Sequence, residues 1–323
     1  MFEYTENNHF KFGYNGTEYN ARKNKDDTFW SGYGPATRKV GTFKEECYRV
    51  ARLIKEKADA LALPVDIMYS GGSDSEVMLR SFIEQDIPVN VNITEFKNDL
   101  NVQDVSCAYK FCDANNIEPI IRKLDIEKFL DSQALEYAEL SSCPTPQMLP
   151  FLWLYDQVKG LPVLGYNTNI VHRDFHKYWK WDIKTMTVIE KPIEEYPKVP
   201  WYVKRNERHM AIFRYPMSKQ KPAVPGFFIY TPEVLLSFLQ HPWAKHLTEC
   251  KEWGEIDIEL SKKKIYEEGF PNITQDKKQT GFEMIMDLDL KCRTILMKKY
   301  GHLNAEHSWE YNKLVDHLNG ENI

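Results

Sequence analysis

A short run of serine, glycine and aspartate is the part of this sequence whose residue types and spacing could do chemistry. Ser70-Gly71-Gly72-Ser73-Asp74-Ser75 follows an apolar, strand-like segment (63–69) and precedes a segment (76–83) with apolar residues at helical spacing. A strand, a glycine turn and a helix together direct unpaired backbone N–H groups at an anion. The glycines permit positive φ and a close backbone approach, and the serines add hydroxyl donors. Residues 70–75, the glycine loop, therefore predict a phosphate site.

The charge of the glycine loop favours a metal-bound nucleotide over a bare phosphate. A Walker A loop ends in Gly-Lys-Ser or Gly-Lys-Thr, but no lysine lies between Asp66 and Lys97 here. Asp74 would repel a polyphosphate unless Mg²⁺ lies between them or the carboxylate caps the helix. We therefore expect Mg-ATP as the ligand, with Asp74 as a metal ligand. The missing positive charge must then come from elsewhere in the chain.

Composition restricts the class of protein. The 323 residues suffice for one large domain or two moderate ones, and a net charge of −5 argues against a protein built globally for nucleic acid or an anionic membrane. No apolar run approaches the length that spans a membrane. The six cysteines form no Cys-x-x-Cys pair, so we expect reduced thiols in a cytoplasmic protein without a membrane partner.

The elements around the glycine loop predict an α/β fold with a doubly wound, mostly parallel sheet. Thr42 should cap a helix that runs to about residue 61. Further strands are expected at 88–93, at 117–124 and from Leu161 onward, with a helix over 104–115. In such sheets ligands bind at the carboxyl ends of the strands, where the glycine loop lies. The predicted divisions of the chain are a small N-terminal β appendage (1–40), the α/β domain (41–185) and a mainly helical C-terminal region that completes the active site (186–323).

Ser-Gly-Gly-x-Asp-Ser after an apolar strand resembles the PP-loop of the N-type ATP pyrophosphatase superfamily, nearest to the synthetase domain of asparagine-synthetase-like enzymes. The match covers all five fixed positions, namely Ser70, Gly71, Gly72, Asp74 and Ser75. The resemblance implies an adenine nucleotide alpha hydrolase-like fold and cleavage of ATP to AMP and pyrophosphate. A carboxylate or amide oxygen would be adenylated and then attacked by an amine, ammonia or a sulfur nucleophile. The alternative is a turn that merely links a strand to a helix.

The resemblance implies further nucleotide-binding residues at the ends of two later strands. In this superfamily the strand that follows the loop helix receives the adenine, which makes Ile93, Thr94 and Glu95 candidates. A later strand ends beside the α-phosphate and the substrate, and Gly165 and Asn167 fall at that point. Asparagine synthetases carry a Ser-Gly-x-Gly-x-Asp-Glu run there, whereas this chain has amides in place of the acids. The alternatives are a core position for Ile93 and an ordinary turn after Gly165.

Basic residues outside the glycine loop could supply the missing charge. Arg173 follows the strand that begins at Leu161 and could contact phosphate. Lys277 and Lys278 precede Gly281 in a stretch similar to a basic loop near the active site of asparagine synthetases. We assign catalytic roles to Asp74, Lys278 and Arg173, although a solvated charged turn would explain the lysines equally well.

A basic and aromatic stretch keeps a second enzyme class open. Lysines and arginines are interleaved with aromatic residues over 201–222, and this mixture is how RNA or a nucleotide is held. The favoured interpretation of the stretch is a cationic loop at the surface or facing ATP. The alternatives are a PP-loop enzyme that modifies tRNA or a nucleobase, and a module that binds ATP without turnover. Phe2 stands where glutamine-dependent asparagine synthetases have a cysteine, so glutamine is not the expected nitrogen donor. The acceptor, an unidentified small molecule or tRNA, stays open, as does a homo-oligomeric state.

Overall fold

A four-stranded parallel sheet lies at the centre of the fold. The computed structural model describes residues 5–24, 26–143, 145–172, 179–182, 187–190, 201–204, 210–249, 258–274, 280–300 and 309–320. The sheet has the order β6-β5-β4-β7, and all its neighbouring strands are parallel. Its strands are β4 (Val65–Met68), β5 (Asn90–Phe96), β6 (Ile120–Leu124) and β7 (Leu161–Leu164). The predicted α/β class with a parallel sheet is therefore confirmed.

The chain reverses its direction across this sheet after β6. Helices α2 (Ser73–Ile83) and α3 (Val102–Ala114) connect β4 to β5 and β5 to β6. The return to β7 runs through α4 (Ile126–Ser132), α5 (Ala134–Ser141) and α6 (Leu149–Gln157). Because parallel crossovers are right-handed, this reversal puts the two groups of helices on opposite faces of the sheet. The reversal point lies between β4 and β7, where open α/β sheets form their ligand crevice.

Helix α1 (Phe43–Ala60) precedes the sheet and begins as the sequence predicts. Thr42 accepts a hydrogen bond from the Glu45 N–H, and the Glu45 side chain returns one to the Thr42 N–H, which is a complete capping box. The buried face of the helix includes Cys47, Val50 and Ile54. This face packs against α2 and against α9 (Pro232–Leu239), so α1 connects the sheet to the C-terminal region.

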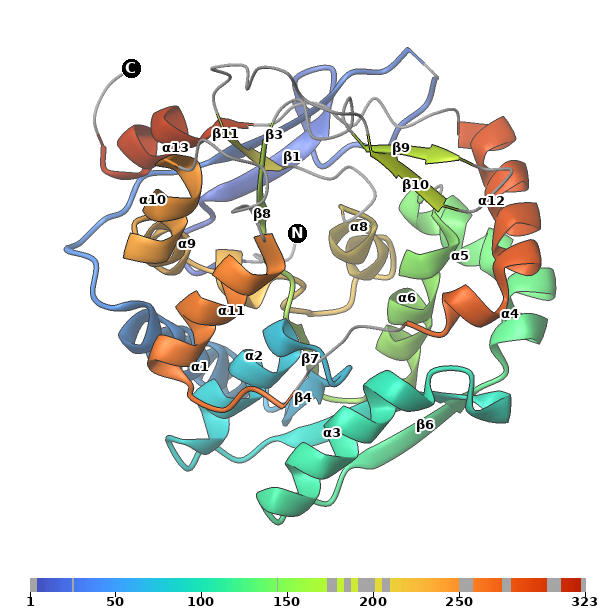
Figure 1. Cartoon of the computed structure of the whole chain (residues 1–323), viewed down its shortest axis with the longest axis horizontal. Helices are drawn as coiled ribbons and strands as arrows, with labels where there is room; N and C mark the ends of the chain where they lie inside the picture. Colours follow the sequence, from blue (N-terminus) through green and yellow to red (C-terminus); the bar gives the residue numbers. More distant parts are fainter. Residues whose placement is uncertain are drawn as a thin grey trace.

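The N-terminal residues form a separate antiparallel sheet in the order β2-β1-β3. Its strands are β1 (Phe10–Tyr14), β2 (Thr17–Glu18) and β3 (Phe29–Tyr33), and Asn15-Gly16, a pair that favours tight hairpins, makes the turn between β1 and β2. The rings of Phe10 and Phe12 lie 5.1 and 5.7 Å from that of Phe213 on helix α8 (Ala211–Ser218). The appendage therefore shares one hydrophobic core with the rest of the chain, and Figure 1 shows β1 and β3 above α8.

The C-terminal region (186–323) is mainly helical, as predicted, but strands that the sequence did not indicate lie within it and just before it. The remaining helices are α10 (Pro242–Glu249), α11 (Ile258–Gly269), α12 (Met286–Tyr300) and α13 (Tyr311–Leu318). An antiparallel sheet joins β8 (Asn169–His172), β11 (Trp201–Lys204) and β12 (Trp309–Glu310), and β9 (Trp179–Asp182) pairs with β10 (Thr187–Glu190). These strands have only two to four residues each, so their pattern in the sequence is weak. Figure 1 shows α9, α10 and α11 on one side of the molecule and α12 on the other.

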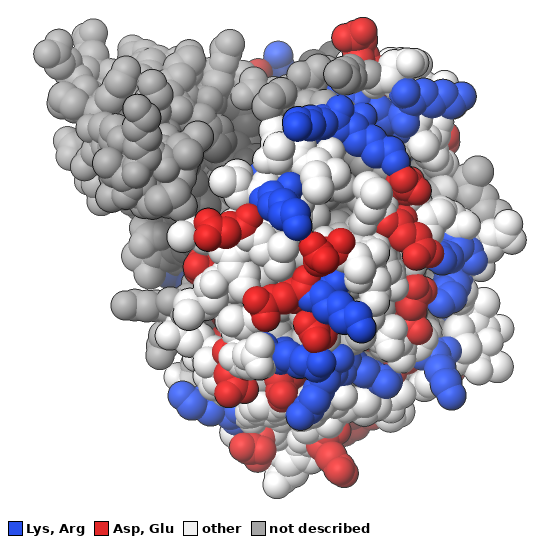
Figure 2. All heavy atoms as spheres, turned by 90° about the vertical axis from the view of Figure 1, so that its right-hand side faces the viewer, with Lys and Arg blue, Asp and Glu red and all other residues white. Residues whose placement is uncertain are grey.

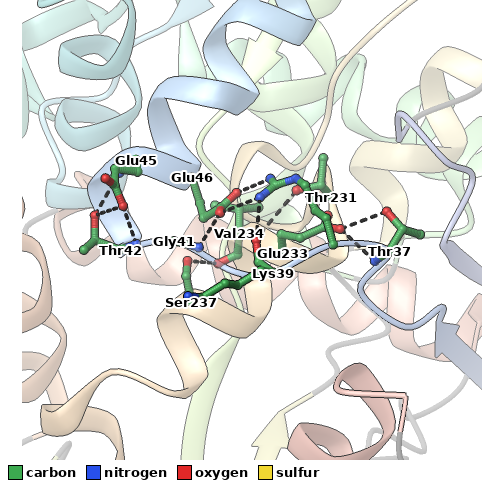
Figure 3. Close-up of polar contacts among 11 residues, drawn as sticks. Thr37, Lys39, Gly41, Thr42, Glu45, Glu46, Thr231, Glu233, Val234 and Ser237 are labelled. Carbon is green, nitrogen blue, oxygen red and sulfur yellow. Dashed lines mark hydrogen bonds and ion pairs between the residues drawn. The ribbon is translucent and has the colours of Figure 1, made fainter.

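A buried polar network fastens the segment before α1 to the helices beside it (Figure 3). Arg38 pairs with the buried Glu46 of α1, and Glu46 also accepts the Gly41 N–H at 2.7 Å. Glu233, buried at the start of α9, accepts the Thr37 N–H at 2.8 Å. Because each buried carboxylate has its donors, the network holds α1 and α9 together without an unpaired charge.

Basic and acidic side chains alternate on the face that carries α12 (Figure 2). Lys291 and Lys299 of this helix pair with Asp131 of α4 and Glu139 of α5. In the part of the chain that the structure describes, no helix combines the length and the apolar character needed to span a bilayer.

Candidate functional site

The glycine loop connects β4 to α2, as the sequence predicts. Gly71 has a φ of +80°, and a Cβ atom at this residue would lie 2.1 Å from the Asp104 carbonyl oxygen on α3. Glycine is therefore required here for two reasons, the left-handed backbone and the close contact with α3. The turn presses the loop against α3, and α2 begins beside the end of β7.

The serines of the loop bond mainly to one another. The Ser75 hydroxyl donates to the Gly72 carbonyl at 2.8 Å and lies 3.0 Å from the Ser70 hydroxyl. The Ser70 N–H points at the Ser75 hydroxyl at 3.3 Å. Gly72 is the N-cap of α2 and has no side chain, so no side chain caps this helix. The partial positive charge at the start of α2 therefore remains available to an anion.

The segment after β7 lies directly against the first turn of α2. Strand β7 pairs with β4 up to Met68 and Leu164, so both strands end at the same edge. A Cβ atom on Gly165 would lie 3.1 Å from the carbonyl oxygen of Asp74 and from the Cα of Ser75. The structure thus brings Gly165 to the glycine loop, which the sequence could suggest only by resemblance.

Asp74 has two partners, both from helix α11. The Lys262 ammonium lies 2.6 Å from one carboxylate oxygen, and the Tyr266 hydroxyl donates to the other. The two residues are four apart, so they project from one face of α11. The Asp74 side chain stays 31% exposed, whereas that of Lys262 is 11% exposed. A basic side chain from the C-terminal region therefore lies at the glycine loop.

Neither Lys262 nor Tyr266 stands out in the sequence as a residue of this site. Lys262 is the first of three consecutive lysines on a predicted helix, and such runs usually face solvent. The one usable signal is the spacing of a lysine and a tyrosine by four residues, which many surface helices share.

Tyr266 is fixed by its surroundings. Its ring is fully buried and stacks on those of Phe43 and Phe228, with centroids 5.6 and 5.7 Å away. Burial, together with the nearby Asp74 carboxylate, raises the pKa of Tyr266 well above its usual value. The phenol therefore stays protonated and acts as a donor to Asp74.

Asn167 reaches the site through Tyr266. Its side-chain amide donates to the Tyr266 hydroxyl at 2.8 Å, while its carbonyl accepts the Thr168 N–H at 2.8 Å. Asn167 is also buried, with 6% of its surface exposed. In this structure it positions Tyr266, and its polar atoms are already paired.

The three adenine candidates of β5 differ in their surroundings. Ile93 is fully buried in the sheet, as its alternative interpretation states. Glu95 accepts a hydrogen bond from the Tyr109 hydroxyl at 2.8 Å. Burial, and secondly this hydrogen bond, raise the pKa of Tyr109 to about 12. The Thr94 hydroxyl oxygen is buried and has no hydrogen-bond partner among the described residues. Thr94 is therefore the candidate with an unused polar group.

Arg173 and Lys278 lie outside the described residues, and so does Lys277. The described residues on both sides of 275–279 contact elements next to the glycine loop. The Thr274 N–H donates to Glu76 of α2 at 2.9 Å, and the Phe282 ring lies 6.2 Å from that of Phe96 at the end of β5.

Glu76 is a buried acid in the first turns of α2. Its side chain is fully buried, and the Arg80 guanidinium lies 3.6 Å from its second oxygen. Burial raises the pKa of the Glu76 carboxyl above its usual value. Arg80 also donates to the Pro271 carbonyl at 2.8 Å, so two adjacent turns of α2 hold the segment that precedes residue 275.

The described residues contain no cluster of three or more histidine, cysteine, aspartate or glutamate side chains that could hold a metal ion. The described cysteines are free thiols, and burial raises the pKa of Cys112 to about 11. Asp74 is thus a single carboxylate beside an uncapped helix. Mg²⁺ commonly binds to one or two protein carboxylates and to substrate phosphates, and this donor set fits that mode.

In comparisons with known proteins, the chain matches no protein-family model and no curated protein. Its functional assignment therefore depends on its own residues, above all on the glycine loop and the side chains around Asp74.

Proposed function

We propose that this protein is a PP-loop ATP pyrophosphatase with an adenine nucleotide alpha hydrolase-like fold. It would cleave ATP to AMP and pyrophosphate and adenylate a carboxylate or amide oxygen for attack by an amine, ammonia or sulfur nucleophile. The observation that carries the proposal is the position of the loop. Ser-Gly-Gly-x-Asp-Ser leaves β4 at the point where the strand order reverses, and it opens the uncapped helix α2.

The proposed phosphate site is built mainly from backbone. The amides of residues 70–75 and the start of α2 would face the phosphates, and Gly165 would leave room for the backbone to approach them. Thr94, with its unpaired hydroxyl, would lie on the adenine side at the end of β5. Because most donors are main-chain groups, single side-chain deletions in the loop should weaken binding only in part.

Asp74 and Lys262 would have different electrostatic roles, one toward Mg²⁺ and the other toward the phosphates. Asp74 would hold Mg²⁺, which neutralises charge on the phosphates and orients them. The Lys262 ammonium, which pairs with Asp74 in this structure, would then be free to turn toward the pyrophosphate. Lys262 joins Lys278 and Arg173 as a candidate for the charge that the loop lacks.

The test is an assay of AMP and pyrophosphate from Mg-ATP. One set of reactions contains pools of amino acids with ammonium, and another contains unmodified tRNA. Two matched pairs of variants give the readout: Asp74→Asn with the exposed Asp59→Asn as control, and Lys262→Met with its neighbour Lys263→Met as control. We expect AMP with one pool only, lost in Asp74→Asn, reduced in Lys262→Met and unchanged in both controls.

Other products separate the remaining hypotheses. ADP in place of AMP would refute α–β cleavage. AMP with tRNA alone would indicate the tRNA-modifying class, although Arg214 of the basic stretch is buried and donates to the Asn20 carbonyl. ATP binding without AMP in either pool would favour a nucleotide-binding module.

A further inference from the structure

A cavity of about 310 Å³ lies at the end of the parallel sheet where β4 and β7 begin, opposite the end that carries the glycine loop. It lies where β7 begins, at Gly160 and Pro162, and strand β7 separates it from the glycine loop. Val158 and Leu63 form part of its apolar wall. Binding sites for small molecules have volumes from about 300 Å³ upward and mostly apolar walls, so the cavity is large enough for one compact ligand.

The walls of this cavity have a fixed shape. Tyr155 and Tyr215 present aromatic rings to it, and Pro162, Pro216 and Pro222 add surfaces that lack an N–H donor. The Val224 N–H donates to the Pro162 carbonyl at 2.8 Å, which ties the segment after Pro222 to β7. The interior therefore offers apolar surface more than hydrogen bonds.

The rim of the cavity is basic. Lys159 lines it, is exposed and has no ion pair or hydrogen bond with any described residue. Lys221 also lines it, and its ammonium lies 3.1 Å from Asp156. The Lys219 amine lies 5.5 Å from the centre of the ring of Tyr215, a residue that lines the cavity.

Asp156 is the acid that Lys221 faces, and its charge is already engaged. It accepts hydrogen bonds from the Tyr137 and Tyr215 hydroxyls as well as from Lys221. With Lys159 and Lys221 at the rim and one carboxylate that is already engaged, the rim carries positive charge. The rim is therefore complementary to an anion, while the walls are complementary to an apolar body.

We propose that this cavity binds a small organic carboxylate with an apolar, ring-sized body. The body would lie between Tyr155, Tyr215 and the prolines, and the carboxylate would meet Lys159 and Lys221 at the rim. This assignment gives a role to the end of the basic and aromatic stretch at 201–222, because its Lys221 lies at the rim. The proposal does not depend on the proposed ATP chemistry, because the cavity lies at the amino ends of the strands and the glycine loop lies at their carboxyl ends.

The test compares acids with their neutral amides. Phenylacetate and phenylacetamide, and indole-3-acetate and indole-3-acetamide, are titrated against the full chain by saturation-transfer NMR and calorimetry. A charge-assisted contact predicts that each acid binds about tenfold tighter than its amide. Lys159→Glu should weaken binding of the acids about tenfold or more, because it replaces an attraction by a repulsion at an exposed residue.

Two further variants make the result specific. Lys110→Glu changes the same charge on the exposed surface of α3 and should leave binding unchanged. Val158→Trp should fill the cavity and weaken binding of acids and amides alike, with a thermal scan to show that the variant folds. Asp74→Asn should bind the acids normally, which separates this site from the glycine loop. Absence of binding by either acid at millimolar concentration, equal binding of acid and amide, or equal effects of Lys159→Glu and Lys110→Glu would overturn the proposal.

Discussion

Two aspartates, one near the start of strand β4 and one in the first turn of helix α2, have opposite surroundings. Asp66, at the start, is buried and accepts the Gly160 N–H at 2.6 Å. Its other oxygen accepts the amides of Asn90 and Asn92 at 3.0 and 3.2 Å. All of these donors belong to neighbouring strands of the same sheet or to the residue just before one. Asp66 therefore has the surroundings of a structural acid, with short, rigid donors that never need to move.

Asp74 lies in the first turn of α2, beyond the glycine loop, and its partners come from a helix distant in the sequence, α11. Its partners are the tip of a flexible lysine and one phenol of α11, and a third of its side chain remains exposed. Such contacts can be exchanged for a ligand at little cost in stability, because solvent reaches the carboxylate already. The buried Asp66, with all its donors in or beside the sheet, therefore stabilises the fold. The partly exposed Asp74, whose partners a ligand can replace, belongs to the candidate site.

The largest effects should come from exchanging the two aspartates for asparagine. In Asp66→Asn an amide N–H₂ meets the donors that the carboxylate accepted, so we expect a loss of about 3 kcal/mol in the free energy of unfolding. In Asp74→Asn the loss should be about 1 kcal/mol or less, while AMP formation falls about a hundredfold or more. Urea unfolding and the AMP assay measure the two quantities. Equal stability losses would contradict the comparison.

The two glycines at the site should differ in the next largest effect. Gly71→Ala places a methyl group in a left-handed residue against the Asp104 carbonyl, and we expect a loss of about 2 kcal/mol in stability. Gly165→Ala meets contacts of 3.1 Å only, so its loss should stay near 1 kcal/mol while ATP binding weakens. Thermal unfolding and equilibrium binding of ATP check both. A smaller loss of stability for Gly71→Ala than for Gly165→Ala would contradict this order, and would show that α3 moves away from the added methyl group more easily than the 2.1 Å contact implies.

Removing one hydroxyl tests how firmly α11 is attached to Asp74. Tyr266→Phe keeps the stacked ring but leaves the Asn167 amide without its acceptor, so we expect a loss of about 1 kcal/mol. Tyr48→Phe is the control, because Tyr48 also donates to a carboxylate, Glu84, but at the exposed surface. Its loss should be within about 0.5 kcal/mol. Urea unfolding of both variants gives the comparison.

The smallest effect is a pH dependence at Glu76. Burial raises the pKa of this carboxyl, so the folded state binds its proton more tightly than the unfolded state does. Glu76 therefore lowers the stability of the protein as the pH rises above about 4.5, its ordinary pKa. In Glu76→Gln this decline should be absent, and the stability of the variant relative to wild type should rise with pH over that range. Unfolding at a series of pH values measures it, and a flat difference would contradict the assigned cause.

Local signals in the sequence predicted much of the frame. Thr42 caps α1 as expected, Thr231 caps α9 as its Thr-Pro-Glu sequence indicates, and Asn15-Gly16 turns the first hairpin. These features depend on residues within four positions of each other, so the chain specifies them without help from distant segments. The alternation of strands and helices likewise predicted the parallel sheet.

Within the site, the sequence determined the loop and the tertiary structure decided its partners. The glycines and serines of 70–75 shape the turn by their own φ angles and mutual hydrogen bonds, so their positions follow from local chemistry. Lys262 and Tyr266 lie 188 and 192 residues from Asp74 along the chain. Nothing near them in the sequence distinguishes them from solvent-facing helix residues, because their role arises only when α11 packs beside α2. A contact between residues so far apart in the sequence depends on how whole helices pack, and this packing is seen only in the tertiary structure.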